Sequence, residues 1–434
     1  MTFMRDFGFV YSLSKVLNHL GCETFVCSNT DYLSAPMRLW DPDVVFYVTV
    51  GRTERIRKAF PRSILVLWNA ESCRFDTYPP LELEIASNRD SYLRMGKVLL
   101  WGEGNRELLI EYAHKNKWEW ITGDMEGFER KFVVVGHPRI DLARYGAPGK
   151  RSQNEKIKVG IIGLCAAVNN GKFSIPELLL NDDGKDDNFV TSQEFCFQMK
   201  YYQLIKRMII DFGTEKYEYN LRPYFLENIN NYAKSELVSS GKLKIDNSIE
   251  FTSWIKRHDL IIGAVSTTMY LVAAAGKPYI SLDFLLDRPM ERIVFAKEYL
   301  SGITSHCPKS YDDFVNMVKN HENLRLTFES SDVLKRQYSK FLKPKEDLPT
   351  LYLMAMEIIK SASEREKISG LPTALCKFIN RTRTAYAEFR GLSSKTNDYS
   401  HFKNKMLYEA DIEFGSTVDE ILKSVPSGKT LQEK

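Results

Sequence analysis

Short apolar runs alternate with helical or polar segments along this chain, and that alternation constrains its fold more than any other feature. The first half holds "VVFYVTV", "ILVLWN", "VLLWG" and "KFVVVGHP", and the second half holds "KIKVGIIGL", "DLIIGAV" and "KPYISL". Such short Val-, Ile- and Leu-rich runs are typical of strands buried on both faces. Strands that alternate with helices indicate parallel sheets covered by helices. We therefore expect an α/β protein.

The first element is predicted to be a helix that ends at Gly21, followed by a strand at Thr24–Cys27. The strand that should precede this helix in a doubly wound domain is missing from the pattern. Either the start codon is placed late or the sheet lacks that strand.

A segment rich in Gly, Pro and charge, "ARYGAPGKRSQNEK" over Ala143–Lys156, divides the chain. It is typical of an interdomain linker, and 434 residues exceed one ordinary core. We expect an N-terminal domain over 1–145, a second α/β domain over 156–345, and C-terminal helices with a basic tail over 346–434. Two such domains would form a cleft, with ligands outside the carboxyl ends of the strands.

Composition excludes several classes of function. Sixty Lys and Arg residues face 56 Asp and Glu residues, a net charge of +4, which gives no support for a nucleic-acid binder. The seven scattered cysteines form no CxxC pair, a pattern that favours reduced cytosolic thiols over a zinc site or disulfides. Neither a signal peptide nor an 18-residue apolar run is present, so we expect a cytoplasmic protein.

Motifs for bound metals and phosphates are also missing from the sequence. The acidic stretch "NDDGKDD" over Asn181–Asp187 is more typical of a turn than of a cation site. Neither a P-loop nor GxGxxG occurs, which argues against kinases and dehydrogenases.

The stretch "AVSTTMYLVAAAGKPYISL" places three hydroxyl residues, Ser266, Thr267 and Thr268, between a strand and an apolar helix. Ser and Thr cap helices well, so the three residues fit a simple helix start. A helix N-terminus also presents N–H donors and a positive dipole end to an anion such as phosphate. Both interpretations remain open at this point.

Several motifs together resemble one enzyme family. "RPYFLE" (Arg222–Glu227), "SIEFTSWIKRHDLIIGAVSTT" and "GKPYISL" are similar to the donor-binding half of bacterial surface-polysaccharide glycosyltransferases of the GT-B type, which include Kdo transferases and capsule and O-antigen enzymes. Teichoic-acid polymerases carry a similar C-terminal half. "WNAES", "LLWGEGNRELL" and "VVGHPRIDLARYG" look like segments of the family's first half. The resemblance covers residues 5–345 and implies two Rossmann-like domains facing across a cleft.

The resemblance implies a donor site in the second domain. Arg222 would clamp a diphosphate or a sugar carboxylate, Ser266 to Thr268 would hold the nucleotide phosphate, and Glu227 matches the family's acidic position. The simpler alternatives are a surface ion pair for Arg222 and a solvated glutamate at a helix start. Glu71, just after "ILVLWN", would act as base on an acceptor hydroxyl or have a structural role. His137 is a minor candidate because a lone His near a strand end is more often structural.

Two positions depart from the family pattern. Tyr224 stands where the family carries His, and Tyr can only hydrogen-bond or stack. Leu271 occupies the position where many GT-B enzymes hold ribose with Glu. Both departures favour a catalytically inactive scaffold as an alternative to an enzyme.

The resemblance predicts a metal-independent glycosyltransferase that uses a nucleotide sugar as substrate and no cofactor. CMP-Kdo is the first donor to consider, and the acceptor would be a glycan or a lipid-linked glycan. A teichoic-type glycerophosphotransferase is the competing enzyme. The basic stretch Lys377–Lys405, with seven Lys or Arg against two acidic residues, would contact anionic lipid at the inner membrane, unless it is simply a solvated tail.

Overall fold

The computed structural model describes residues 2–26, 42–68, 85–146, 155–165, 169, 193–224, 227–246, 250–286, 300–365 and 414–425. Contacts divide the chain into two compact units. The terminal unit combines Thr2–Gly146 with Gln337–Lys434, and the middle unit spans Ala147–Arg336. Residues 346–434, expected to form a separate part, thus cluster with the N-terminal residues.

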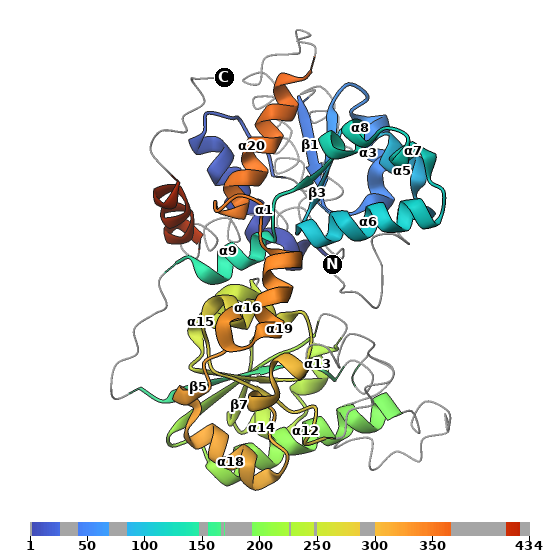
Figure 1. Cartoon of the computed structure of the whole chain (residues 1–434). Helices are drawn as coiled ribbons and strands as arrows, with labels where there is room; N and C mark the ends of the chain where they lie inside the picture. The colour runs from blue at the N-terminus through green and yellow to red at the C-terminus, as the bar shows by residue number, and fades with distance from the viewer. Residues whose placement is uncertain are drawn as a thin grey trace, which may run out of the picture. The chain divides into compact units, whose positions relative to one another are not determined.

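The terminal unit is built on a four-stranded parallel sheet in the order β1-β2-β3-β4 (Figure 1). Its strands are β1 (Val44–Tyr47), β2 (Ile64–Trp68), β3 (Lys97–Leu100) and β4 (Phe132–Val134). Its helices are α1 (Thr2–His19), α3 (Thr53–Ala59), α5 (Arg89–Leu93), α6 (Glu103–Lys115), α7 (Glu119–Thr122), α8 (Met125–Lys131), α9 (Pro138–Arg144), α20 (Thr350–Ser363) and a helix over residues 414–424, with a 3-10 turn η2 (Val50–Arg52) and a π-helical turn η7 (Tyr338–Leu342).

The strand predicted at Thr24–Cys27 is wrong for the residues that the structure describes. Thr24 to Val26 are irregular, Cys27 lies outside the described residues, and the sheet begins with β1. Gly21, with φ of 85°, ends α1 shortly before this segment. Instead, α20 from the far end of the chain packs on α1, α9, β1 and β2.

The middle unit contains a five-stranded parallel sheet in the order β7-β6-β5-β8-β9. Its strands are β5 (Ile157–Ile162), β6 (Tyr217–Arg222), β7 (Leu243–Ile245), β8 (Leu260–Gly263) and β9 (Tyr279–Ser281). Its helices are α12 (Gln193–Phe212), α13 (Ile229–Tyr232), α14 (Glu236–Ser239), α15 (Phe251–Arg257), α16 (Thr268–Ala275), α18 (Tyr311–Lys319) and α19 (Asp332–Gln337, whose last residue belongs to the terminal unit), with 3-10 turns η4 (Thr304–His306), η5 (His321–Asn323) and η6 (Phe328–Ser330).

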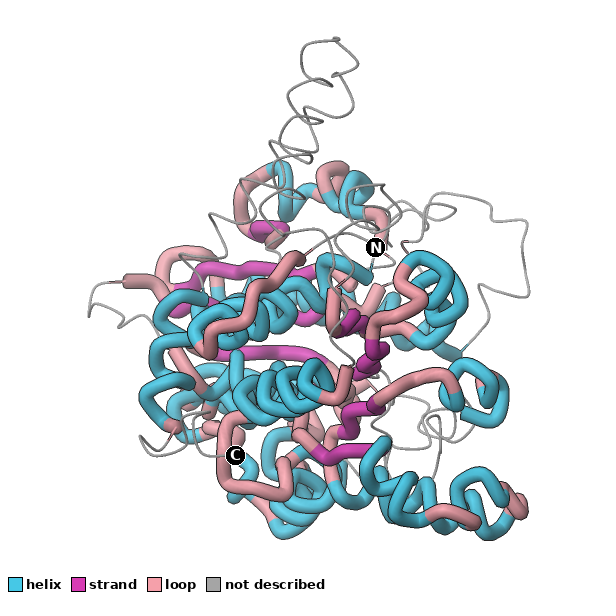
Figure 2. The backbone as a smooth tube through the Cα atoms, turned by 90° about the horizontal axis from the view of Figure 1, so that it is seen from above, coloured by secondary structure: helices cyan, strands magenta, loops and turns pink. Residues whose placement is uncertain are grey.

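Burial explains the apolar runs. Every residue of β8 is buried, as a strand covered on both faces requires. Figure 2 shows helices running alongside the strands. The predicted α/β class, with two Rossmann-like parallel sheets, is confirmed. How the two units face each other stays a prediction.

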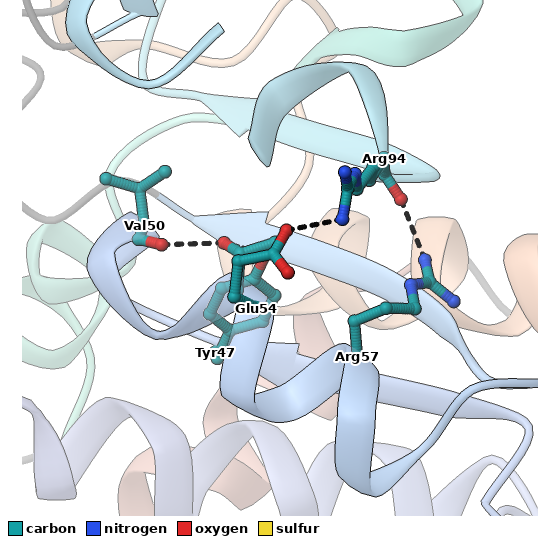
Figure 3. Close-up of polar contacts among 6 residues, drawn as sticks. Tyr47, Val50, Glu54, Arg57 and Arg94 are labelled. Atoms are coloured by element: carbon teal, nitrogen blue, oxygen red, sulfur yellow. Dashed lines mark hydrogen bonds and ion pairs between the residues drawn. The ribbon is translucent and has the colours of Figure 1, made fainter. Parts of the chain in front are cut away.

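Polar contacts tie α3 to the sheet of the terminal unit (Figure 3). The Thr53 hydroxyl donates to the Val50 carbonyl at 2.7 Å and lies 3.0 Å from the Tyr47 hydroxyl at the end of β1. Arg57 donates to the carbonyl of Arg94 at 2.7 Å, and the Arg94 guanidinium pairs with Glu54 at 2.7 Å. Burial raises the pKa of Tyr47 to about 12, so this phenol stays neutral.

Candidate functional site

The strand order of the middle sheet creates a topological switch point. The chain builds β5, β6 and β7 toward one edge and then returns to add β8 and β9 on the other side of β5. Loops that follow β5 and β8 therefore lead away from each other. In open parallel sheets, ligands bind at such a point, outside the carboxyl ends of the strands.

The loop after β8 carries the three predicted hydroxyl residues. The Ser266 hydroxyl accepts a hydrogen bond from the Thr268 N–H at 3.3 Å, and the Ser266 carbonyl accepts from the Met269 N–H at 3.1 Å. Ser266 and Thr268 are half-buried, whereas Thr267 is exposed and makes no side-chain cap bond. The Ser266 side chain thus caps the start of α16 through a long hydrogen bond, whereas the Thr267 side chain makes no cap bond.

The loop after β6 approaches the end of β5 closely. The Gly163 N–H donates to the Arg222 carbonyl at 2.7 Å, and a Cβ on Gly163 would lie 2.6 Å from that same oxygen. Only glycine permits this approach. The Arg222 guanidinium lies over the Phe251 ring, with its carbon 5.2 Å from the ring centroid. Arg222 is half-buried, and Tyr224, two residues on, is 45% exposed.

Glu227 lies inside the protein, which rules out a solvated glutamate. Its side chain is buried, and its carboxylate accepts from the Cys165 N–H at 2.8 Å and from the Tyr232 hydroxyl. Burial raises the pKa of Glu227 to about 7, against the lowering effect of these two donors. The carboxylate therefore holds the end of β5, rather than presenting itself to solvent.

Leu271 is buried in α16, so the position where many GT-B enzymes hold ribose with Glu belongs here to the apolar core. Asp283, which the sequence analysis did not single out, lies two residues beyond β9 and is fully buried. Its carboxylate accepts from the Val265 N–H at 2.7 Å and from the Ser281 hydroxyl at 2.5 Å. A carboxylate just past a strand end in an apolar stretch was the available signal.

The motifs from the first half meet at the carboxyl ends of β2, β3 and β4. The Trp68 and Trp101 rings are stacked with centroids 5.6 Å apart, and the His137 ring lies edge-on to Trp101 at 4.2 Å. Phe9 of α1 packs on Trp68 at 4.8 Å. All four side chains are buried, and they form an aromatic floor at this end of the sheet. Glu71 itself lies outside the described residues.

Asp141 has a structural role in the terminal unit. Its carboxylate is buried and accepts from the Leu351 N–H at 2.8 Å, in the first turn of α20. Burial raises the pKa of Asp141 to about 7, against the lowering effect of this bond. This carboxylate caps α20 and thereby joins the two ends of the chain.

The described part of the chain holds no group of three or more His, Cys, Asp or Glu side chains arranged to bind a metal ion. None of its helices is both long and apolar enough to cross a membrane. The basic stretch at 377–405 and the "NDDGKDD" segment lie outside the described residues.

Comparisons with known proteins give only distant similarities. No family model and no curated protein matches the chain. Similar solved structures include a variant of the wall teichoic acid polymerase TagF soaked with CDPG (TM-score 0.40, 11% identity, covering 81% of this chain and 94% of that one). They also include a putative UDP-N-acetylglucosamine 2-epimerase from Listeria monocytogenes (0.38, 12%, 82% and 81%) and S. aureus MnaA with UDP (0.39, 13%, 84% and 84%).

Proposed function

We propose that the protein is a glycosyltransferase that moves a sugar from a nucleotide donor to a growing bacterial surface glycan, with the donor at the carboxyl edge of the middle sheet. The observation that carries this proposal is the arrangement at the switch point. The exposed Thr267 hydroxyl and the first turn of α16 follow β8, and Arg222 ends β6, two strands away. Neighbouring strands lie about 4.8 Å apart, so these groups are within reach of one diphosphate.

The chemistry of these groups suits a departing nucleotide. The N-terminus of α16 would stabilise negative charge on a phosphate, and a guanidinium would add charge-assisted hydrogen bonds. Together they would stabilise the developing charge on the leaving group without a metal ion.

The acceptor half of the proposal rests on the terminal unit. Glu71 follows Trp68, and the aromatic floor of Trp68, Trp101 and His137 lies at the same strand ends. The buried rings would support the strand ends from below, and a carboxylate there would serve as the base on an acceptor hydroxyl. Both substrates would then be bound at the carboxyl ends of parallel strands.

A thermal-shift screen against CMP, CDP, UDP and GDP tests the proposal. A ligand at 100 times its Kd should stabilise the native state by about 2.7 kcal/mol. Stabilisation by CMP would favour CMP-Kdo as the donor, and stabilisation by CDP or CDP-glycerol would favour the glycerophosphotransferase. No stabilisation by any of them would contradict donor binding and favour the inactive scaffold.

A further inference from the structure

The two loops that border the switch point are each held by a buried carboxylate from the neighbouring loop. Glu227, after β6, binds the N–H of Cys165 after β5 at 2.8 Å. Asp283, after β9, binds the N–H of Val265 after β8 at 2.7 Å. The two carboxylates follow β6 and β9, the strands that flank the central pair β5 and β8, so the same arrangement occurs on both sides of that pair.

Further bonds reinforce each side. The β5 loop is tied to the β6 loop by the Asn228 N–H, which donates to the Asn169 carbonyl at 2.8 Å, and by the Asn231 amide, which donates to the Asn169 side chain at 2.9 Å. The β8 loop is tied to β9 by the Tyr279 hydroxyl, which donates to the Ala264 carbonyl at 3.0 Å. Each loop is therefore tied outward, away from the seam between β5 and β8.

Burial makes these contacts demanding. Asp283 is completely buried, with 0% of its surface exposed to solvent, and Glu227 is 7% exposed. A buried carboxylate is strongly unfavourable unless donors compensate it. One donor to each carboxylate belongs to the loop that it holds, and another is the Tyr232 or Ser281 hydroxyl on the carboxylate's own side. A loop that moved would therefore take a charge-assisted hydrogen bond away from a buried carboxylate. The position of Val265 is thus coupled to Asp283, and Ser266 follows directly.

We propose that Asp283 and Glu227 are positioning residues that hold the β8 and β5 loops open at the switch point and thereby fix the shape of the ligand-binding edge. The inference rests on the proposed function for the identity of the ligand, a nucleotide. Neither carboxylate touches that ligand. Each acts through a backbone N–H, Asp283 through Val265 and Glu227 through Cys165.

The chain offers a matched control for Asp283. Asp259 precedes β8, and its carboxylate accepts from the Lys158 N–H at 2.8 Å, so it makes the same kind of bond at the opposite, amino edge of the same sheet. If Asp283 were only structural, Asp283→Ala and Asp259→Ala should behave alike. If Asp283 positions the loop, only Asp283→Ala should disturb the carboxyl edge.

The experiment measures hydrogen exchange over residues 264–270 in the ligand-free protein and nucleotide affinity by calorimetry. Asp283→Ala should speed exchange in this segment and weaken nucleotide binding on the order of tenfold, the effect of losing about one charge-assisted hydrogen bond. Asp283→Asn keeps an acceptor oxygen and should recover most of both, and Asp259→Ala should change neither. Equal exchange over 264–270 in Asp283→Ala and Asp259→Ala would overturn the inference, and so would an affinity loss in Asp259→Ala as large as that in Asp283→Ala.

The two proposals fail separately. If the wild type binds none of the nucleotides, the proposed function is contradicted, and the exchange data still decide whether Asp283 holds the loop. If the wild type binds a nucleotide and Asp283→Ala binds it equally well, the positioning role is contradicted and the proposed function stands. Should Asp283→Ala fail to fold, Asp283→Ser against Asp259→Ser supplies the same comparison, because Ser lacks the carboxylate at both positions.

Discussion

Single residues at the carboxyl edge of the middle sheet are constrained by the close approach of a neighbouring backbone and by burial. Gly163 is the clearest case, because its missing side chain lets two loops meet. Glu227 is the second, because its carboxylate is satisfied only by partners inside the protein. For each of these two residues, a single substitution has an expected effect on stability.

Gly163→Ala should destabilise the protein by about 1–3 kcal/mol, the usual range for overpacking. The added Cβ would lie 2.6–2.7 Å from the backbone atoms of Arg222, Pro223 and Tyr224, which cannot turn aside as a flexible side chain could. Chemical denaturation measures the change. Gly51→Ala, where a Cβ would meet nothing within 4 Å, is the control and should stay within about 0.5 kcal/mol of wild type. Equal stability of both variants would contradict the close approach.

Glu227 should make stability depend on pH. Its folded pKa, raised to about 7 from 4.5, lies above the unfolded value, so the native state holds the proton more tightly. The stability that this group contributes is fully present below pH 4.5 and is lost as the pH rises toward 7. The loss amounts to about 3 kcal/mol at 1.36 kcal/mol per unit.

Urea denaturation at pH 5 and pH 7 measures this loss. Asp141 contributes with the same sign, so Glu227→Gln should reduce the difference between the two pH values without abolishing it. The exposed Glu236→Gln is the control and should leave the difference unchanged. An undiminished difference in Glu227→Gln would show that Glu227 does not titrate in this range.

At the scale of elements, α20 ties the end of the chain to the first sheet. Asp141 accepts a hydrogen bond in its first turn, and Glu357, farther along, pairs with Lys97 at the start of β3. The Lys97 ammonium lies 2.8 Å from the Glu357 carboxylate, and its side chain is only 5% exposed.

Lys97→Met should destabilise the terminal unit by about 3 kcal/mol, because it leaves Glu357 without its buried partner. The double variant Lys97→Met/Glu357→Leu should recover most of that loss, since two apolar side chains replace a buried pair well. Thermal and urea unfolding measure both. Arg94→Met breaks an exposed pair with Glu54 and should change stability by at most ~0.5 kcal/mol. A double variant no more stable than Lys97→Met alone would contradict this account.

Sequence patterns predicted the sheets because strands that are buried on both faces must be apolar. β8 was recognisable as a strand for that reason. The end of α16 was also recognisable, because the Gly of "GKP", Gly276, has a φ of 60° and ends the helix. The roles of Glu227 and Asp283 could not be predicted, because Cys165 comes close to Glu227, and Val265 to Asp283, only when the strands pair. The same holds for α20, whose place on α1 depends on contacts across the whole chain.

At the scale of the whole molecule, we propose that the enzyme would meet a lipid-linked acceptor at the inner membrane. The basic stretch Lys377–Lys405 would provide the membrane contact. Replacing its seven Lys and Arg residues with Gln should abolish co-sedimentation with anionic vesicles at low salt, since each basic residue contributes roughly 1 kcal/mol near such a surface.

Substitution is preferable to deleting residues 364–434 in this test. The helix over residues 414–424 buries Phe414, Val418 and Ile421 in the terminal unit, and Glu420 accepts from the Gly146 N–H at 2.7 Å. A deletion would therefore disturb the fold as well as the charge. Neutral vesicles are the control, and undiminished binding of the substituted protein to anionic vesicles would remove the membrane contact from the account.

The central claim is that the carboxyl edge of the middle sheet binds a nucleotide, and a calorimetric titration of the preferred nucleotide tests it most directly. Thr267→Ala is a clean probe because Thr267 makes no cap bond, so the fold should be unaffected while binding weakens a few-fold. Arg222→Ala should weaken binding more, by at least about tenfold, because a charge-assisted contact to phosphate is roughly twice as strong as a neutral one. Arg207→Ala, on α12, removes an arginine held over Tyr311 and should bind like the wild type. Equal affinity in the wild type, Thr267→Ala and Arg222→Ala would contradict the claim and leave α16 as a capped helix in an α/β unit.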